Sequence, residues 1–184
     1  INQKIFVSLR KLEKTIPQEQ FHPEAMEKIA LLGLSNAGKT SIIKTILYQF
    51  EELIGLTPTK SVKRTNFQFL GREIIVWDYG AQDRFKKNYF RNPEKYFQSI
   101  AYLYYIIDVQ DSNALIESLS YFLKAYKYIT QFNPSASIIL FFHKMDPDYK
   151  GKNDPMVFKK QFLEKLNSQV THLQSHFQIY ETTI

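Results

Sequence analysis

The sequence contains no cysteine, which excludes disulfide bonds and metal sites built on thiolates. This composition fits a reducing compartment, and we expect a cytoplasmic protein. The sequence also has no apolar run long enough to span a bilayer, no internal repeat and no low-complexity tract. With 184 residues, of which 44% are hydrophobic, the chain can bury the core of one globular domain.

Basic residues outnumber acidic ones by 24 to 18, which gives a formal net charge of +6. A basic balance indicates acidic partners, namely anionic lipid, nucleic acid or nucleotide phosphate. A solvated lysine-rich surface is an equally good interpretation. The composition alone therefore leaves the class of partner open.

An amphipathic segment precedes the domain. Apolar residues recur at helical spacing among basic ones, at Ile5, Leu9, Leu12 and Ile16. We predict an N-terminal helix and linker over residues 1–23, followed by one domain over residues 24–184. The helix fits an anionic membrane surface, which would make the protein peripheral on a membrane, and it fits packing on protein equally well. Because the chain begins at Ile1 rather than methionine, we expect any lipidation signal to lie before it.

Strand-like and helical segments alternate along the rest of the chain. The hydrophobic pattern predicts strands over residues 28–32, 65–70, 73–78, 100–107, 137–142 and 177–182, and helices over 40–50, 114–130 and 155–175. This alternation is typical of an α/β fold, in which helices cover both faces of a mostly parallel sheet. Ligands of such folds bind at the carboxyl ends of the strands, and the polar motifs of this chain fall there.

The segment Gly33–Thr40 (GLSNAGKT), called the phosphate loop below, follows the first predicted strand of the domain and begins a helix. It fits the pattern G-x-x-x-x-G-K-[ST], in which backbone N–H groups surround phosphate oxygens. Lys39 is expected to contact the β- and γ-phosphates, and Thr40 to coordinate Mg²⁺. The loop alone would equally suit a small-molecule kinase or an ATPase. The predicted nucleotide contacts here are Gly33, Ser35, Asn36, Ala37, Gly38, Lys39, Thr40 and Ser41.

A carboxylate and an amide follow another apolar strand, in the stretch IIVWDYGAQDRF. Asp78 ends the strand, as expected for a carboxylate that supports Mg²⁺ through water. Gln82 follows, where its amide would orient a water molecule for in-line attack on the γ-phosphate. A strand cap for Asp78 and a plain surface amide for Gln82 are the alternative interpretations.

The letters HKMD close a further apolar strand and have the form of a guanine-recognition motif. The carboxylate of Asp146 would accept two hydrogen bonds from N1 and N2 of guanine, which adenine cannot donate. Lys144 would lay its aliphatic stem over the base or ribose, and His143 stands where asparagine is usual. These motifs predict GTP or GDP with Mg²⁺ as ligands. The remaining predicted nucleotide contacts, from the segment ETTI, are Thr183 and Ile184.

Five elements occur in order: GLSNAGKT, a threonine in the exposed loop, WDYGAQ, HKMD and ETTI. Together they resemble the small GTPases of the Ras superfamily, over residues 28–184. The resemblance implies a three-layer P-loop G domain with a six-stranded, mostly parallel sheet. Two branches stay open, because GLxxAGKT and the spacing of Pro58 and Thr59 resemble Arf and Arf-like proteins, whereas WDYGAQDRFKKNYF, HKMD and ETTI resemble Rag proteins.

The resemblance also implies a GTP-hydrolysing molecular switch with a slow intrinsic rate. Thr59 would close over Mg²⁺ and the γ-phosphate, with Thr57 as its rival, and would act with Gln82 and Lys39 in catalysis. Residues 51–64 (switch I) and 79–99 (switch II) would be ordered by γ-phosphate and released after hydrolysis. Effectors, an exchange factor and an activating protein would bind these segments.

Three positions depart from the family pattern. Ala81 stands where glycine normally precedes the glutamine and meets the γ-phosphate through its N–H, so we expect an effect on switching or hydrolysis rather than on nucleotide binding. Ser35 stands where many members have glycine, and an imidazole at His143 can replace the tie that asparagine makes. Ala81 favours the alternative hypothesis of a weakly hydrolysing, guanine-nucleotide-binding scaffold subunit with a Rag-like dimer partner.

Switch II is basic and aromatic over residues 84–91 (RFKKNYFR). Such a composition can indicate nucleic acid. Aromatic side chains in a switch more often form a protein-binding surface. We therefore favour a protein partner over nucleic acid.

Overall fold

The computed structural model describes residues 27–69, 72–151, 153–170 and 177–183. The N-terminal helix and linker predicted over residues 1–23, and the predicted contact Ile184, lie outside the described residues. None of the described helices is long and apolar enough to cross a membrane.

Six strands form one sheet with the order β2-β3-β1-β4-β5-β6. The β2–β3 pair is antiparallel and every other pair is parallel, so the predicted mostly parallel six-stranded sheet is confirmed. Because parallel strands run in one direction, the carboxyl ends of β1, β3, β4, β5 and β6 lie along one edge. The strands are β1 Glu27–Gly33, β2 Val62–Phe69, β3 Arg72–Tyr79, β4 Tyr102–Asp108, β5 Ser137–His143 and β6 Phe177–Thr182.

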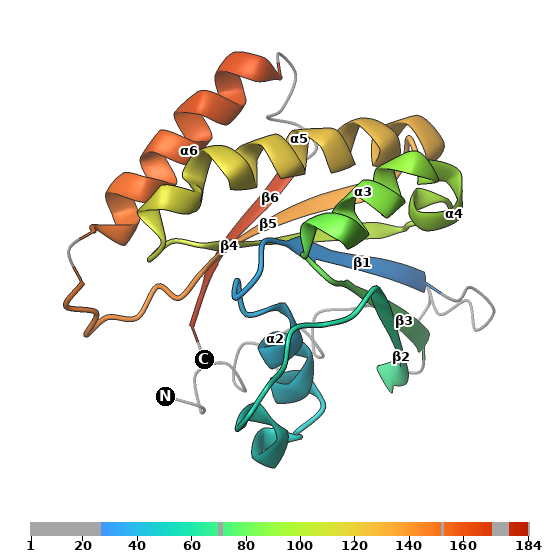
Figure 1. The fold of residues 1–184 in the computed structure, drawn as a ribbon, viewed down its shortest axis with the longest axis horizontal. Coiled ribbons are helices and arrows are strands. Elements are labelled where there is room, and N and C mark those ends of the chain that lie inside the picture. The colour runs from blue at the N-terminus through green and yellow to red at the C-terminus, as the bar shows by residue number, and fades with distance from the viewer. Residues whose placement is uncertain (1–26, 70–71, 152, 171–176, 184) are drawn as a thin grey trace, which may run out of the picture.

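Helices cover both faces of the sheet, as the α/β prediction requires. Figure 1 shows α2 on one face and α3, α4, α5 and α6 on the other. Short 3₁₀ turns, η2 Phe50–Leu53 and η3 Ser112–Ala114, lie in the connections. The helices are α2 Lys39–Ile46, α3 Asp83–Arg91, α4 Pro93–Phe97, α5 Leu115–Phe132 and α6 Pro155–Gln169.

Strand β4 shows why the strands are apolar at successive positions. Leu103 and Tyr105 belong to a large buried cluster that includes residues of α5 and α6, whereas Ile106 belongs to a smaller cluster with Ile43 of α2. Side chains alternate across a strand, so a parallel strand covered on both faces can bury side chains that point to either face. Full burial of each large apolar side chain contributes about 1.5–3 kcal/mol.

The hydrophobic pattern predicts no helix in switch II, where the structure has α3 and α4. The letters RFKKNYFR are too polar for a strong apolar periodicity. The helix signals are electrostatic and steric instead: Asp83 lies in the first turn of α3 and Arg91 in its last, where each complements the helix dipole. Pro93 occupies the first turn of α4, where its missing N–H costs nothing.

Two predicted helices are shorter in the structure. Helix α2 ends at Ile46 rather than near residue 50, because Tyr48 turns the backbone into the left-handed region at φ 57°. Helix α6 ends at Gln169, short of the predicted end at Ser175. Strand β2 begins at Val62, inside the predicted exposed loop 51–64.

Candidate nucleotide site

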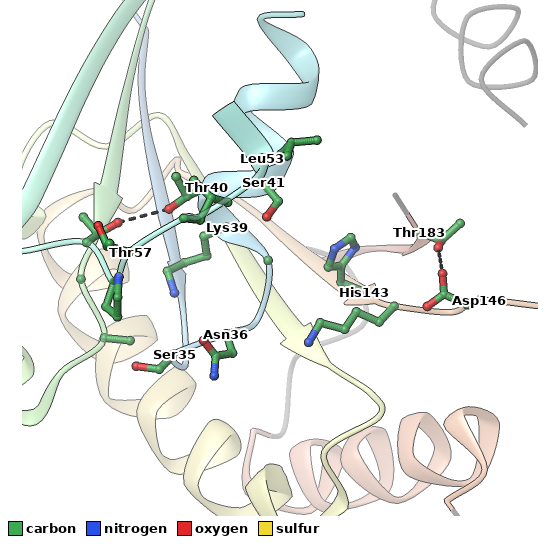
Figure 2. Close-up of a pocket in the computed structure, with 17 residues that line it drawn as sticks. Ser35, Asn36, Lys39, Thr40, Ser41, Leu53, Thr57, His143, Asp146 and Thr183 are labelled. Carbon is green, nitrogen blue, oxygen red and sulfur yellow. Dashed lines mark hydrogen bonds between the residues drawn. The ribbon is translucent and has the colours of Figure 1, made fainter. Parts of the chain in front are cut away.

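A cavity of about 540 Å³ lies at the carboxyl edge of the sheet. Figure 2 shows Ser35, Asn36 and Lys39 of the phosphate loop on one side of it and His143 and Asp146 on the other. The motifs that the sequence separates by more than 100 residues therefore meet in one site. The predicted site residues that line the cavity are Ser35, Asn36, Gly38, Lys39, Thr40, Ser41, Thr59, Ala81, His143, Lys144, Asp146 and Thr183.

The phosphate loop depends on two glycines at points of close approach. A Cβ atom on Gly33 would lie 2.3 Å from the carbonyl oxygen of Ile106, and one on Gly38 would lie 2.5 Å from Cδ2 of His143. Both glycines also have positive φ, 147° and 91°, which disfavours a side chain. Gly33 and the buried Ala37 belong to the predicted contacts but do not line the cavity.

Lys39 is a buried cation at the floor of the cavity. The residue is 7% exposed. Its Nζ donates to the carbonyl oxygens of Gly33 at 3.0 Å and Leu34 at 2.7 Å. Burial lowers the pKa of Lys39 from 10.5 to about 8, against a raising influence from Asp78. Among the described residues no carboxylate forms an ion pair with Lys39, so the charge is available to an anion such as phosphate.

Three oxygen ligands converge beside Lys39. The hydroxyls of Thr40 and Thr59 donate to Oδ2 of Asp78, at 2.7 Å and 3.1 Å, and lie 3.1 Å from each other. Asp78 is 1% exposed, and its Oδ1 is buried with no hydrogen-bond partner in the described part of the chain. Thr57 lines the cavity too, but it is Thr59 that reaches Asp78.

This oxygen set fits magnesium. Mg²⁺ prefers hard oxygen ligands and commonly combines one or two protein groups with phosphate and water. An unsatisfied buried carboxylate oxygen is costly unless a ligand compensates it. No group of three or more His, Cys, Asp or Glu in residues 27–69, 72–151, 153–170 and 177–183 could hold a metal ion by itself. A metal here would therefore rely on Asp78, the threonine hydroxyls and the phosphates of a bound nucleotide.

The start of switch II touches switch I through the backbone. Gly80 donates its N–H to the carbonyl oxygen of Ser61 at 2.7 Å, and a Cβ on Gly80 would lie 2.2 Å from the carbonyl oxygen of Thr59. The glycine requirement at this turn therefore falls on Gly80. Ala81 has no positive φ here and lines the cavity.

Gln82 lies outside the main cavity. Its Oε1 accepts a hydrogen bond from Nε of Arg84 at 3.2 Å, and the residue lines a neighbouring cavity of about 410 Å³ together with Ser35 and Asn36. The role assigned to Gln82 from the sequence requires its side chain to turn toward the phosphate loop. That role stays a prediction.

His143 joins the base side of the cavity to the phosphate loop. Its ring packs on Gly38, and Nδ1 lies 2.9 Å from the hydroxyl of Thr182 at the end of β6. The residue is 3% exposed, and burial lowers the pKa of His143 below its usual value, which favours the neutral imidazole. The structure thus gives the histidine a bridging position between two loops.

Asp146 is held by two neighbouring side chains. Thr183 donates its hydroxyl to Oδ1, as Figure 2 shows, and Gln110 donates Nε2 to Oδ2 at 2.8 Å. Nζ of Lys144 forms an ion pair with Asp108 at the end of β4. The carboxylate predicted to recognise guanine therefore faces the cavity in a fixed orientation.

The sequence interpretation missed three residues of this site: Asp108, Gln110 and Thr182. Each follows or ends a strand of the parallel part of the sheet, β4 for Asp108 and Gln110 and β6 for Thr182. Asp108 comes directly after the strand predicted over residues 100–107, and Gln110 follows two residues later. A polar residue at the carboxyl end of a central strand is the signal that would have identified them.

Residues 28–184 match the family model described as the Gtr1/RagA G protein conserved region. The chain belongs to the Gtr1/RagA G protein family. This confirms the resemblance to Ras-superfamily small GTPases of the Arf and Rag side, and the family is the Rag-like one of the two branches left open. GTP or GDP with Mg²⁺ are the ligands of such small GTPases.

Relatives of this family share limited identity with the chain. It is 33% identical over 124 residues to GTP-binding protein GTR1 of Saccharomyces cerevisiae, covering 65% of this chain and 40% of the relative. It is 28% identical over 167 residues to Ras-related GTP-binding protein B of Rattus norvegicus, covering 73% of this chain and 44% of the relative. The chain thus spans less than half the length of these relatives.

A solved structure supports the fold independently. The Arl6 BBS3 small GTPase from Trypanosoma brucei with bound nucleotide analogue GppNp superposes with a TM-score of 0.63 at 21% identity. The match covers 86% of this chain and 87% of that one. The observed sheet and helix arrangement is therefore that of a small GTPase G domain.

Proposed function

We propose that this chain is the G domain of a molecular switch that binds GTP or GDP with Mg²⁺ and hydrolyses GTP slowly. The observation that carries this proposal is the convergence of Lys39, Thr40, Thr59 and Asp146 on one cavity of about 540 Å³, with the buried Asp78 hydrogen-bonded to both threonines. Those groups supply a cation for phosphate, oxygen ligands for a metal and a carboxylate for guanine. One guanine nucleotide with its metal satisfies all three.

Each part of the site has a separate chemical task in this proposal. Lys39 and the backbone of the phosphate loop bind the β- and γ-phosphates, which compensates the burial of the ammonium group. Thr40, Thr59 and Asp78 would hold Mg²⁺, which neutralises charge on the phosphates. Gln82 would orient the attacking water once its side chain leaves Arg84.

The partners in this proposal are proteins that distinguish the two nucleotide states. Switch I carries exposed apolar side chains next to the cavity, including Ile54 at 88% exposure, with Phe50 and Leu56 nearby in the sequence. Exposed apolar groups beside a nucleotide-sensing segment favour a protein-binding surface. Effectors, an exchange factor and an activating protein would bind here.

Attachment to a membrane is a separate part of the proposal. It rests on the amphipathic, basic sequence between residues 4 and 16. Cosedimentation with vesicles that contain anionic lipid tests it, by comparing residues 1–184 with residues 24–184. Equal binding of both lengths would remove the N-terminal segment as a membrane anchor.

A second candidate function is a guanine-nucleotide-binding scaffold subunit that hydrolyses little and pairs with a Rag-like dimer partner. Two observations favour it: alanine rather than glycine at residue 81, and the contact of Gln82 with Arg84 outside the main cavity. In this case the bound nucleotide would stabilise a surface for assembly, and its hydrolysis would not switch the protein between two states.

Single-turnover hydrolysis of prebound GTP separates the two candidates. We expect slow hydrolysis by the wild type, a loss of about tenfold or more in Gln82→Leu, and faster hydrolysis in Ala81→Gly. If the wild type shows no turnover and neither substitution changes this, the scaffold function replaces the switch.

Mass spectrometry of the copurifying nucleotide tests the base site itself. We expect GDP or GTP. Asp146→Asn should shift the preference from guanine to xanthine nucleotides, because an amide donates where the carboxylate accepted. Adenine nucleotide in the purified protein would overturn the proposed function.

A further inference from the structure

Gln110 lies two residues beyond the carboxyl end of β4 and reaches across to the loop that follows β5. Its Nε2 donates to Oδ2 of Asp146 at 2.8 Å and to the carbonyl oxygen of Lys144 at 2.9 Å. A side-chain amide has two N–H groups, so it can satisfy both acceptors at once. These two bonds fix the amide in one orientation, with its nitrogen toward the loop.

The backbone of Gln110 is anchored as well. Its N–H donates to Oδ1 of Asp108 at 3.0 Å, and the other carboxylate oxygen of Asp108 pairs with Nζ of Lys144. Lys144 itself has a left-handed backbone, with φ 65°. Such a conformation is costly for a residue other than glycine and persists where surrounding contacts fix it. The bond from Gln110 to the Lys144 carbonyl is one of those contacts.

The pattern of bonds around Asp146 leaves room for a ligand. Thr183 donates to Oδ1 and Gln110 donates to Oδ2, so each oxygen accepts one bond from the described residues. A carboxylate oxygen can accept about two hydrogen bonds. One acceptor site therefore stays available on each oxygen. Two parallel N–H donors, such as N1–H and N2–H of guanine, match this arrangement.

We propose that Gln110 is a positioning residue for guanine selection, which acts by holding Asp146 in the orientation that accepts two donors at once. This inference rests on the proposed binding of guanine nucleotides. It gives a residue in the segment after β4, outside the phosphate loop and the HKMD motif, a role in base recognition. Gln110 does not itself contact the base in this proposal.

The physical reason for an effect on selectivity is preorganisation. A carboxylate without the Gln110 bond can rotate toward water, and the nucleotide must then restore its orientation on binding. Hypoxanthine lacks the N2 amino group of guanine and donates one of the two bonds. If Asp146 is not held in one orientation, the ratio of guanine to hypoxanthine nucleotide affinity should therefore fall. This fall comes in addition to any loss of affinity that both nucleotides share.

The test compares the affinities of GDP and inosine diphosphate for the 184-residue chain by competition with a fluorescent GDP analogue. Gln110→Ala removes the amide, and Gln110→Glu keeps the size but sets a carboxylate against Asp146. The matched control is Gln161→Ala, an exposed glutamine of α6 away from the cavity. Thermal unfolding of each nucleotide-free variant reports any general structural damage.

We expect Gln110→Ala to weaken the binding of GDP about tenfold, as for a lost hydrogen bond to a charged group. The ratio of GDP to inosine diphosphate affinity should fall severalfold in the same variant. Gln110→Glu should weaken the binding of GDP further, because the new carboxylate and that of Asp146 carry like charges. Gln161→Ala should match the wild type.

An unchanged ratio of GDP to inosine diphosphate affinity in Gln110→Ala would overturn the inference. If both affinities then fall equally and the unfolding temperature is lower, Gln110 has a structural role instead. A wild type that does not prefer guanine nucleotides at all would instead refute the proposed function, so the two failures are distinguishable.

Discussion

The hydroxyl of Tyr89 in α3 donates a hydrogen bond to the carbonyl oxygen of Ser61, 2.8 Å away and just before β2. The same hydroxyl lies 3.2 Å from the carbonyl oxygen of Gly80, whose N–H donates to Ser61. Tyr89 is fully buried, and burial raises its pKa, so the group stays a neutral donor. One side chain thus connects the two proposed switch segments.

Removing this hydroxyl tests the connection. We expect Tyr89→Phe to lower the free energy of unfolding by about 1–1.5 kcal/mol, because one buried acceptor loses its donor. Release of bound nucleotide should also become faster, since switch I loses a tether to α3. Urea unfolding and dissociation of a fluorescent GDP analogue measure the two effects. Tyr126→Phe is the control, because the Tyr126 hydroxyl has no hydrogen bond within the described residues. Equal behaviour of the two variants would contradict the prediction.

Gly38 should tolerate a side chain less well than another glycine with positive φ. A Cβ on Gly38 would lie 2.5 Å from the His143 ring and would also strain the backbone at φ 91°. Gly55 has φ 77° but no atom within 4 Å of its Cβ position, so Gly55→Ala introduces backbone strain without a steric clash. We expect Gly38→Ala to lose nucleotide during purification and Gly55→Ala to retain it. Nucleotide content by absorbance after denaturation is the measurement.

The histidine contact can be separated from the strain with a second substitution. His143→Ala combined with Gly38→Ala removes the close contact but keeps the positive φ. Partial recovery of nucleotide content in this double variant is the expected result. No recovery would mean that the backbone strain, rather than the ring of His143, decides the effect.

His143 should make stability depend on pH. Burial, and to a lesser degree Lys144, lowers the pKa of His143 below the 6.5 of the unfolded chain, while Asp108 and Asp146 oppose the shift. The unfolded chain then binds more protons, so the free energy of unfolding rises with pH through this window and falls as pH decreases below about 6.5. We expect the free energy of unfolding of His143→Asn to fall less than that of the wild type between pH 7.5 and pH 5, measured by urea unfolding. Parallel pH profiles for both proteins would refute the assignment.

Asp78 should couple nucleotide release to magnesium. In the wild type we expect removal of Mg²⁺ by EDTA to accelerate GDP release about tenfold or more, because the metal bridges protein oxygens and phosphate. Asp78→Asn should release GDP quickly in either condition, since an amide is a poor substitute for a carboxylate ligand. Asp148→Asn, an exposed residue in the loop beyond the HKMD motif, serves as the control. A full EDTA response in Asp78→Asn would exclude Asp78 from the metal site.

The strands and most of the site could be predicted because their signals are local. An apolar run that ends in a polar motif marks both a buried parallel strand and its functional end, as at Asp78 and His143. Helix α3 was missed because it is polar and its start and end depend on charge rather than on periodicity. Gln110 was missed for a different reason. Its role arises from contacts with Lys144 and Asp146, 34 and 36 residues away, which no local pattern encodes.

The position of Gln82 could not be predicted for a third reason. Motif spacing places its backbone beside the phosphate loop, but rotation about its side-chain bonds decides whether the amide faces Arg84 or the cavity. Sequence therefore fixes the location of this residue and leaves its orientation to the bound ligand and partners.

The buried charges of Lys39 and Asp78 have a consequence for the life cycle of the protein. Without a nucleotide, the Lys39 ammonium group has two carbonyl oxygens but no anion as partners, and Oδ1 of Asp78 has no partner among the described residues. We therefore expect the nucleotide-free protein to be less stable than its GDP-bound or GTP-bound form. If the proposed function holds, we therefore expect the nucleotide-free state to be short-lived during the exchange of GDP for GTP.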